Sequence, residues 1–247
     1  MTTGDRPFAG RVAVMGGTGR QGLGLALRWA AAGLPVAIGS RDAQRARQAV
    51  DRLRQALERA GLPLKAEVAG APNAEAAAWA DVVVLTVPPQ ALDSSLPPLV
   101  HVLRDRVVVD VSAALVRTPD GHWRADLPAE GSTALRVRRL LGGHRRLAAA
   151  FHTVSSALLA EPRRSLAGDD TAVFADEPEA AETAAALARA VGCARGRRRS
   201  PRRGARRAGG GAAAGAGQPP PPPVGRVALH APGAPVRGVR AFSGSRR

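Results

Sequence analysis

The chain has 247 residues, of which 45% are hydrophobic and only 3% aromatic, so small apolar side chains must build its core. The formal net charge of +16 is typical of nucleic-acid-binding proteins, but residues 194–247 contain 13 Arg and no Asp or Glu. The basic character therefore belongs to the end of the chain. A single cysteine, Cys193, excludes an internal disulfide framework and suits a reducing cytoplasm. No uncharged apolar run reaches the ~20 residues that span a bilayer.

We interpret residues 1–9 as an N-terminal extension. MTTGDRPFAG lacks the apolar core of a secretory signal, so no such signal is expected. The pattern next predicts a buried strand over Arg11–Met15, a glycine-rich loop, and a helix that ends near Gly33. A second strand is predicted over Pro35–Gly39. The strand–loop–helix unit contains the spacing G-x-G-x-x-G, which is typical of dinucleotide-binding proteins. Its expected cofactor contacts are Gly17, Thr18, Gly19, Arg20, Gln21 and Gly22.

The end of the second strand indicates which dinucleotide binds. NAD enzymes place a carboxylate there for the ribose 2′-hydroxyl, whereas this chain has Ser40 and Arg41, with Arg45 one helical turn later. Hydroxyl and guanidinium groups favour the 2′-phosphate of NADP. Asp42 fits better as a residue of the first turn of the next helix. The alternative is that Arg41 and Arg45 belong to an ordinary solvated helix face.

Strands and helices alternate over the following residues. Helices are predicted over 42–60, from Asn73 (as N-cap) to Trp79, and over 90–103 with an interruption at Pro97-Pro98; strands are predicted over 65–69, 82–87 and 106–111. This order predicts an α/β protein with a Rossmann-like, doubly wound parallel sheet. Ligands of such sheets lie beyond the carboxyl ends of the strands. We therefore expect Thr86, Val87, Pro88, Ser112 and Ala113 near the nicotinamide half of the cofactor.

Residues 118–131 are predicted to be a loop with a turn at Asp120-Gly121, followed by a helix over 133–141 that Ser132 caps. A strand over 147–151 then leads into His152-Thr153-Val154-Ser155-Ser156. A lone histidine is often only structural, but this one ends a strand beside several hydroxyl groups. A further strand is predicted over 171–175 and a last helix over 177–191.

The segments GGTGRQGLGLALRWAAAG, IGSRD, VVVLTVPP and FHTVSSALL resemble the NADPH-dependent reductases of the deazaflavin coenzyme F420, over about residues 10–192. The resemblance implies NADP as cofactor, F420 as co-substrate and a homodimer. It implies that the strand ends and Ser156 contact NADP, and that His152, Thr153 and Ser155 contact the deazaflavin. The family commonly has Pro-Ala where this chain has Ser155-Ser156. The resemblance does not identify a catalytic acid or base.

After residue 193 the chain departs from the family, which has a helical segment there that completes the deazaflavin pocket and the dimer contact. Glycine runs and five consecutive prolines cannot form that helix. One interpretation of residues 194–247 is a disordered basic arm that binds polyanions weakly. The other is a frameshift, since Arg197–Ser200 and Ala212–Ala216 become Val-Asp-Ala-Val and Leu-Leu-Leu-Ala-Leu one base later, with permissible codons. We expect NADPH binding but weak turnover and weak dimerisation with this tail.

The residues thus predict an NADP-binding domain over 10–193, and the family resemblance implies an oxidoreductase that transfers a hydride between NADP(H) and F420. One alternative is an NADPH-binding redox sensor or nucleic-acid-associated protein without turnover. Another is a related Rossmann reductase with a flavin or imine acceptor. No His/Cys metal-ligand spacing occurs in the sequence, and hydride transfer needs none, because the cofactor carries the chemistry.

Overall fold

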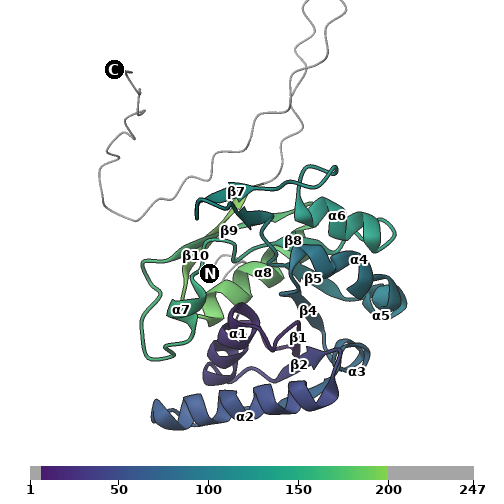
Figure 1. Cartoon of the computed structure of the whole chain (residues 1–247). Coiled ribbons are helices and arrows are strands. Elements are labelled where there is room, and N and C mark those ends of the chain that lie inside the picture. Colours follow the sequence, from purple (N-terminus) through teal and green to yellow (C-terminus); the bar gives the residue numbers. More distant parts are fainter. Residues whose placement is uncertain (1–6, 200–247) are drawn as a thin grey trace, which may run out of the picture.

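The computed structural model describes residues 7–199, which fold around one eight-stranded sheet (Figure 1). Its strands, in their order across the sheet, are β3 (Val68–Pro72), β2 (Val36–Ser40), β1 (Val12–Met15), β4 (Val82–Leu85), β5 (Val107–Asp110), β8 (Leu147–Ala149), β9 (Asp170–Ala175) and β10 (Ala194–Arg199). Neighbouring strands of this sheet are parallel except for β8 and β9. The predicted Rossmann-like α/β fold is confirmed.

The central strands are short apolar runs that are buried on both faces. The sequences VVVL in β4 and VVVD in β5 are buried at every position, as expected of parallel strands that helices cover on both sides. Successive residues of a strand point to opposite faces. In β1, accordingly, Val12 and Val14 join one apolar core, whereas Ala13 and Met15 join the other.

Two layers of helices supply the other half of each core. One face is covered by α1 (Arg20–Ala31), α2 (Ala43–Arg59), α7 (Ser156–Leu159) and α8 (Pro178–Ala190). The other is covered by α3 (Asn73–Trp79), α4 (Leu92–Ser95), α5 (Val100–Leu103), α6 (Thr133–Leu140) and the 3-10 turns η1 (Pro89–Ala91) and η2 (Pro97–Leu99). The sheet therefore lies between two helical layers, and loops are left to occupy its ends.

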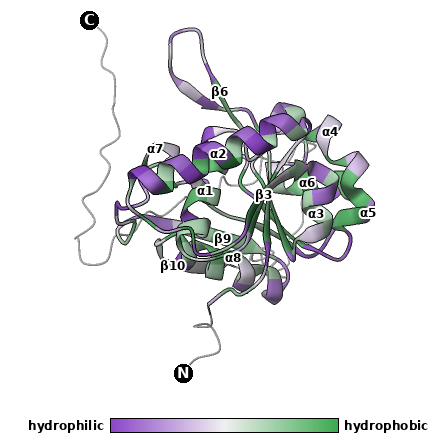
Figure 2. Cartoon of the chain, turned by 90° about the horizontal axis from the view of Figure 1, so that it is seen from below, coloured by the Kyte–Doolittle hydropathy of each residue, from purple (hydrophilic) through white to green (hydrophobic). Residues whose placement is uncertain are grey.

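Helix α2 has one apolar and one polar side, as its sequence predicts. Ala46, Val50, Leu53 and Leu57, spaced three and four residues apart, are buried, and hydrophilic residues alternate with apolar ones along the helix in Figure 2. Asp42 is the N-cap rather than a first-turn residue: its Oδ1 accepts hydrogen bonds from the backbone N–H groups of Gln44 (2.8 Å) and Arg45 (3.2 Å). The predicted cap Ser132 is confirmed, since its hydroxyl accepts from the N–H of Leu135.

Three details of the helical elements differ from the predictions. Asn73 is the first residue of α3 and Pro72 its N-cap, so the side chain of Asn73 does not cap the helix. The helix predicted over 90–103 is interrupted at Pro97-Pro98, as expected, but it is also divided elsewhere, so that η1, α4, η2 and α5 replace it. The prolines cause this division, because each lacks the N–H that a continuous helix needs. The short helix α7 has no counterpart in the prediction.

Three details of the strands also differ. The loop predicted over 118–131 includes part of a hairpin, β6 (Leu115–Arg117) and β7 (Trp123–Ala125), on either side of the predicted Asp120-Gly121 turn. Strand β9 runs antiparallel to β8. Residues 194–199, expected to begin the disordered tail, form β10 beside β9. Residues 1–6 and 200–247, which include the rest of the predicted tail, lie outside the described residues.

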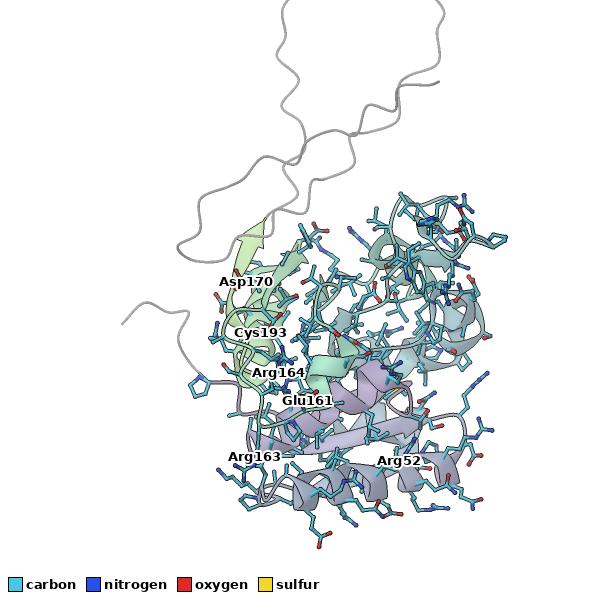
Figure 3. The ribbon with its side chains drawn as sticks, turned by 60° about the vertical axis from the view of Figure 1, so that its left-hand side comes forward. Arg52, Glu161, Arg163, Arg164, Asp170 and Cys193 are labelled. Carbon is cyan, nitrogen blue, oxygen red and sulfur yellow. The ribbon has the colours of Figure 1, made fainter. Side chains whose placement is uncertain are left out.

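A buried arginine ties α1 to the segment between α7 and β9. The guanidinium of Arg28 donates to the carbonyls of Leu158 and Glu161 (both 2.6 Å) and Arg164 (2.8 Å), with longer contacts to the carbonyls of Leu159 (3.3 Å) and Val191 (3.5 Å). Arg28 is only 6% exposed. Figure 3 shows Glu161 and Arg164 close together in this segment, whereas Arg163 lies nearer to α2. One cation thus neutralises carbonyl dipoles at the ends of α7 and α8.

Candidate functional site

The register of the sheet brings the ends of four strands to one edge. Met15 of β1 pairs with Leu85 of β4, Leu85 with Asp110 of β5, and Asp110 with Ala149 of β8. The loops that follow these strands therefore begin side by side. They contain most of the residues that the sequence analysis selected, which supports a single binding edge.

Two glycines of the loop are required by the protein itself. A Cβ atom on Gly17 would lie 2.8 Å from the carbonyl oxygen of Val14. On Gly22 it would lie 2.4 Å from Oγ1 of Thr86 and 2.7 Å from Cα of Gly17. These distances are too short for any side chain. Gly22 therefore allows α1 to pack against the end of β4, as expected of the third glycine in this motif.

The middle glycine faces open space instead. A Cβ atom on Gly19 would come no closer than 3.5 Å to another protein atom, and its φ of −79° suits any residue. Gly19 is the N-cap of α1 but has no side chain to cap it, and the first turn of α1 contains no acidic residue. Free N–H groups at a helix N-terminus attract phosphate. The loop, with Thr18, Arg20 and Gln21, therefore fits a pyrophosphate group.

The sequence analysis missed an arginine beside this loop. Nη2 of Arg52 on α2 lies 3.5 Å from the carbonyl oxygen of Thr18, and Arg52 is labelled on α2 in Figure 3. Because it lies ten residues beyond Asp42, no motif at the start of α2 includes it. The contact brings a further positive charge close to the glycine-rich loop.

The end of β2 presents the residues expected to select the cofactor. Ser40 is 8% exposed. Its Oγ accepts a hydrogen bond from the N–H of Asp42 at 3.2 Å, so the hydroxyl proton of Ser40 remains available to a ligand. Arg41 is exposed. Nε of Arg45 lies 3.7 Å from a carboxylate oxygen of Asp42, and both side chains are mostly exposed. The Asp42 carboxylate is thus engaged by its own helix.

The residues expected at the nicotinamide half follow β4 and β5. Oγ1 of Thr86 donates to the carbonyl of Met15 at 2.8 Å, which joins the end of β4 to the end of β1. Val87 is nearly buried, whereas Pro88 is exposed. Ala113 follows the buried Ser112 and is half-buried. The structure places these residues at the predicted edge of the sheet.

The segment 152–156 lies against the glycine-rich loop. Nε2 of Gln21 donates to the carbonyl of Val154 at 3.1 Å. Two of the hydroxyl groups serve the fold: Oγ1 of Thr153 donates to the carbonyl of Asp170 at 2.9 Å, and Oγ of Ser155 caps α7 by accepting from Ala157. Ser156 begins α7. The Gln21 contact joins the expected cofactor half of the site to the expected substrate half.

Next to this segment lies a buried carboxyl group that the sequence analysis did not select. Asp110 is fully buried, and its Oδ1 accepts from the N–H (3.0 Å) and Oγ (2.5 Å) of Ser112. Its Oδ2 is buried without a hydrogen-bond partner among the described residues. Burial raises the pKa of Asp110, while the Ser112 hydrogen bonds and the charge of His152 oppose this rise. The sequence signal that could have pointed to this buried carboxyl group is an Asp at the end of an otherwise apolar strand.

His152 is affected by the same group. The surrounding protein lowers the pKa of His152, whereas the Asp110 charge and the carbonyl of Ser112 raise it. The preceding Phe151 has a φ of +66°, which is uncommon for a bulky residue, and its N–H donates to Oγ1 of Thr171 at 2.7 Å. Such conformations cluster at functional sites.

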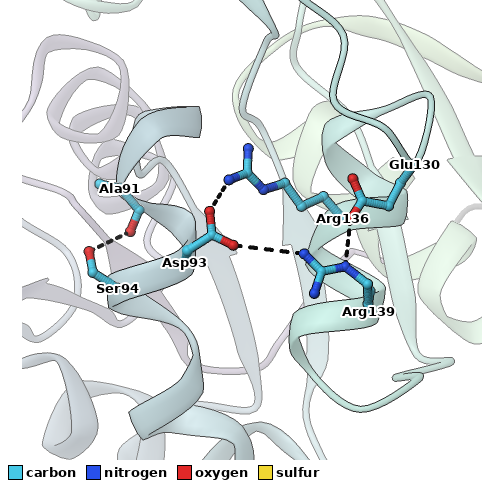
Figure 4. Close-up of polar contacts among 6 residues, drawn as sticks. All are labelled: Ala91, Asp93, Ser94, Glu130, Arg136 and Arg139. Atoms are coloured by element: carbon cyan, nitrogen blue, oxygen red, sulfur yellow. Dashed lines mark hydrogen bonds and ion pairs between the residues drawn. The ribbon is translucent and has the colours of Figure 1, made fainter.

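A shallow cleft opens between the loops that follow β4 and β5 and the start of α6. Its lining includes Pro89, Gln90, Thr133 and Arg136 together with residues 114–116. An ion-pair network supports one wall: Asp93 of α4 pairs with Arg136 and Arg139 of α6, and Arg139 also pairs with Glu130 (Figure 4). Two residues of its lining, Pro89 and Ala114, directly follow Pro88 and Ala113, which are expected at the nicotinamide half.

Within residues 7–199, no group of three His, Cys, Asp or Glu side chains could hold a metal ion. No helix in the same part of the chain is long and apolar enough to cross a membrane.

Comparison with known proteins identifies the family. The family model described as "NADP oxidoreductase coenzyme F420-dependent" matches residues 11–114. The F420-dependent NADP reductase of Methanothermobacter thermautotrophicus is 43% identical over 183 residues, which cover 73% of this chain and 77% of the relative. This chain belongs to the F420-dependent NADP oxidoreductase family. The enzyme of the same name from Methanothermobacter marburgensis is 37% identical over 191 residues, covering 74% and 83% of the two chains.

The fold agrees with this membership. A crystal structure of a candidate F420-dependent NADP reductase from Arthrobacter sp. FB24 superposes with a TM-score of 0.63 at 21% identity, covering 78% of this chain and 85% of that one. The matched family model contains the glycine-rich loop, the end of β2 and the ends of β4 and β5. In this member of the family, the open surface at Gly19 and the acid-free N-terminus of α1 fit the phosphates of a dinucleotide.

Proposed function

We propose that this protein transfers a hydride between NADP(H) and coenzyme F420, with both substrates held at the carboxyl edge of the sheet. The observation that carries the proposal is the 43% identity to an F420-dependent NADP reductase over a segment that contains a complete strand–loop–helix unit. The cofactor contacts are those predicted, from Gly17 to Gly22, with Thr86, Val87, Pro88, Ala113 and Ser156 at the nicotinamide half.

The 2′-phosphate of NADP binds at the end of β2. Support comes from the free proton of the Ser40 hydroxyl, the exposed Arg41 and the engagement of Asp42 as a helix cap. A carboxylate free to face the ribose would favour NAD instead. Arg45 contributes positive charge at the same place. The preference for NADP therefore comes from charge-assisted hydrogen bonds.

The deazaflavin lies between the segment 152–156 and the cleft beside α6. His152 is the side chain of this segment that the fold leaves exposed, whereas the hydroxyls of Thr153 and Ser155 are bound to the protein. The Gln21–Val154 hydrogen bond holds the two halves of the site in a fixed relative position. Hydride transfer requires this alignment of the two rings, because a misplacement of about 1 Å can cost ~100-fold in rate.

We place the protein in the cytoplasm, because its one cysteine is buried and unpaired in a chain without other thiols.

An anaerobic assay tests the proposal by mixing the full chain with NADPH and coenzyme F420 and following the absorbance of oxidised deazaflavin. We expect turnover with F420 that exceeds turnover with riboflavin or FMN, and tighter binding of NADPH than of NADH. Arg41→Ala should reduce this preference by about 1–3 kcal/mol. Arg59→Ala, at the other end of α2, is the matched control and should leave it unchanged. Equal affinities for NADH and NADPH would contradict the cofactor assignment.

A further inference from the structure

One arginine of α2 lies beside the glycine-rich loop with most of its hydrogen-bonding capacity unused. Nη2 of Arg52 makes a single long contact, at 3.5 Å, to the carbonyl oxygen of Thr18, and the side chain is exposed (Figure 3). Among residues 7–199 Arg52 forms no ion pair, whereas Arg45 of the same helix lies 3.7 Å from Asp42. Because a guanidinium group has five N–H donors, four of those of Arg52 remain available to a ligand.

The part of the loop that Arg52 contacts lies on the side of β2. A Cβ atom on Gly17 would lie 3.0 Å from Cγ2 of Ile38 in β2. A Cβ atom on Gly39, the residue before Ser40, would lie 2.7 Å from Cε of Met15, which directly precedes the loop. The start of the loop thus packs against the end of β2. The Thr18 contact therefore places Arg52 on the side of the loop where the 2′-phosphate is expected.

Arg52 continues a row of positive charge on α2. Arg45 and Arg52 are seven residues apart, so they point to the same side of the helix. The separation along the helix axis is about 10 Å, and both side chains are exposed. Asp42, the acidic residue nearest to this row in the sequence, is engaged as the N-cap of α2. The row therefore favours an anion that lies between the loop and the start of α2.

We propose that Arg52 is a further specificity-determining residue, whose guanidinium donates to the 2′-phosphate of NADP. The inference rests on the proposed placement of this phosphate at the end of β2. A phosphate monoester has three strong acceptor oxygens, so it can accept from Arg52 in addition to Ser40 and Arg41. The contact with Thr18 holds the guanidinium beside the site before the ligand binds, which lowers the entropic cost of the new hydrogen bonds. Because NAD lacks this phosphate, a contact made only to it separates the two cofactors.

The first test compares two cofactors in the full chain with Arg52→Met, which keeps most of the aliphatic stem. We expect the Kd for NADPH, measured by calorimetry, to rise about tenfold, the scale of a charge-assisted hydrogen bond, and the Kd for NADH to change less than about twofold. Arg59→Met, seven residues further along α2 and also exposed, is the matched control and should change neither value. An unchanged Kd for NADPH in Arg52→Met would overturn the proposal. Equal weakening of both cofactors would also overturn it, since the contact would then be to the pyrophosphate that both contain.

A second test isolates the phosphate from the nicotinamide. The full chain is titrated with 2′,5′-ADP and with 5′-ADP, which lacks the 2′-phosphate. Arg52→Met should weaken the binding of 2′,5′-ADP alone, and Arg52→Lys should weaken it less, because lysine keeps the charge but not the fork of donors. If Arg52→Lys bound 2′,5′-ADP no better than Arg52→Met, the positive charge would have no part in binding and the proposal would fail.

A measurement of stability separates binding from support of the loop. Because Arg52 is exposed and its contact is long, we expect Arg52→Met to melt within about 2 °C of the unmutated protein. A lower melting temperature together with weaker binding of both cofactors would show that Arg52 only holds the loop at Thr18, and would overturn the proposal.

None of these measurements uses F420, so they stand whether or not the chain transfers a hydride. Equal affinities of the unmutated protein for NADPH and NADH would contradict the proposed cofactor preference itself. A preference for NADPH that is present in the unmutated protein and unchanged in Arg52→Met would overturn this inference alone.

Discussion

The buried guanidinium of Arg28 offers a sharp test of how α1 is attached to the rest of the site. In Arg28→Met the aliphatic stem remains, but the carbonyls that Arg28 contacts lose their donor. Three of the contacts, to Leu158, Glu161 and Arg164, are 2.8 Å or shorter. At about 1–1.5 kcal/mol net for each, and with the two longer contacts neglected, the free energy of unfolding should fall by about 3–4 kcal/mol. For a domain of this size the melting temperature should fall by about 10 °C.

Urea unfolding followed by circular dichroism measures this loss. Arg54→Met is the matched control, since the exposed Arg54 makes one long and partly buried contact, at 3.3 Å, to the carbonyl of Val68. We expect the control to cost less than about 0.5 kcal/mol. A loss below about 1 kcal/mol in Arg28→Met would refute the reasoning, because it would mean that the carbonyls find other partners or that the desolvation cost of the cation cancels its hydrogen bonds.

Further predictions concern the loop, the thiol and the surface ion pairs. Gly22→Ala should lower both stability, by about 1–3 kcal/mol, and NADPH affinity, because the new Cβ would collide with Thr86. Gly19→Ala should lower only the affinity; a matched stability loss in this variant would contradict the open space at Gly19. Burial raises the pKa of Cys193 to about 11, so a thiol reagent at neutral pH should label the native protein about 100-fold more slowly than the unfolded one. Asp93→Asn removes two ion pairs that are partly exposed, and thermal unfolding should show a cost below about 1 kcal/mol.

The sequence predicts the Rossmann-like half of the fold well because each signal there is local. Glycines at fixed spacing, apolar strands such as 82–85 and the polar–apolar alternation of α2 need no distant contact to be recognised. The direction of β9 is not local. A parallel β9 would need a long crossover connection from β8, usually a helix. The segment between β8 and β9 contains only the four-residue helix α7, and the two strands are antiparallel.

Other features could not be predicted because the same residue types have a more common role. The hairpin strands β6 and β7 have only three residues each. The sequence ARGRRR of β10 has no apolar alternation and instead suggests a solvated tail. Arg28 looks like a surface residue of an Ala/Leu helix until the carbonyls of α7 and α8 surround it. Asp110 looks in the sequence like the ordinary end of an apolar strand, and neither its burial nor its hydrogen bonds to Ser112 can be seen there.

The most direct test of the central claim follows the hydride itself. NADPH that carries deuterium at C4 of the nicotinamide is mixed anaerobically with the full chain and oxidised coenzyme F420 in ordinary water, and the reduced deazaflavin is analysed by mass spectrometry. We predict that label on one face of C4 is transferred to the deazaflavin without exchange with solvent, and that label on the other face stays in NADP. Reduced deazaflavin without deuterium from either labelled NADPH, or no reduction at all, would contradict direct transfer between two rings held at this edge of the sheet.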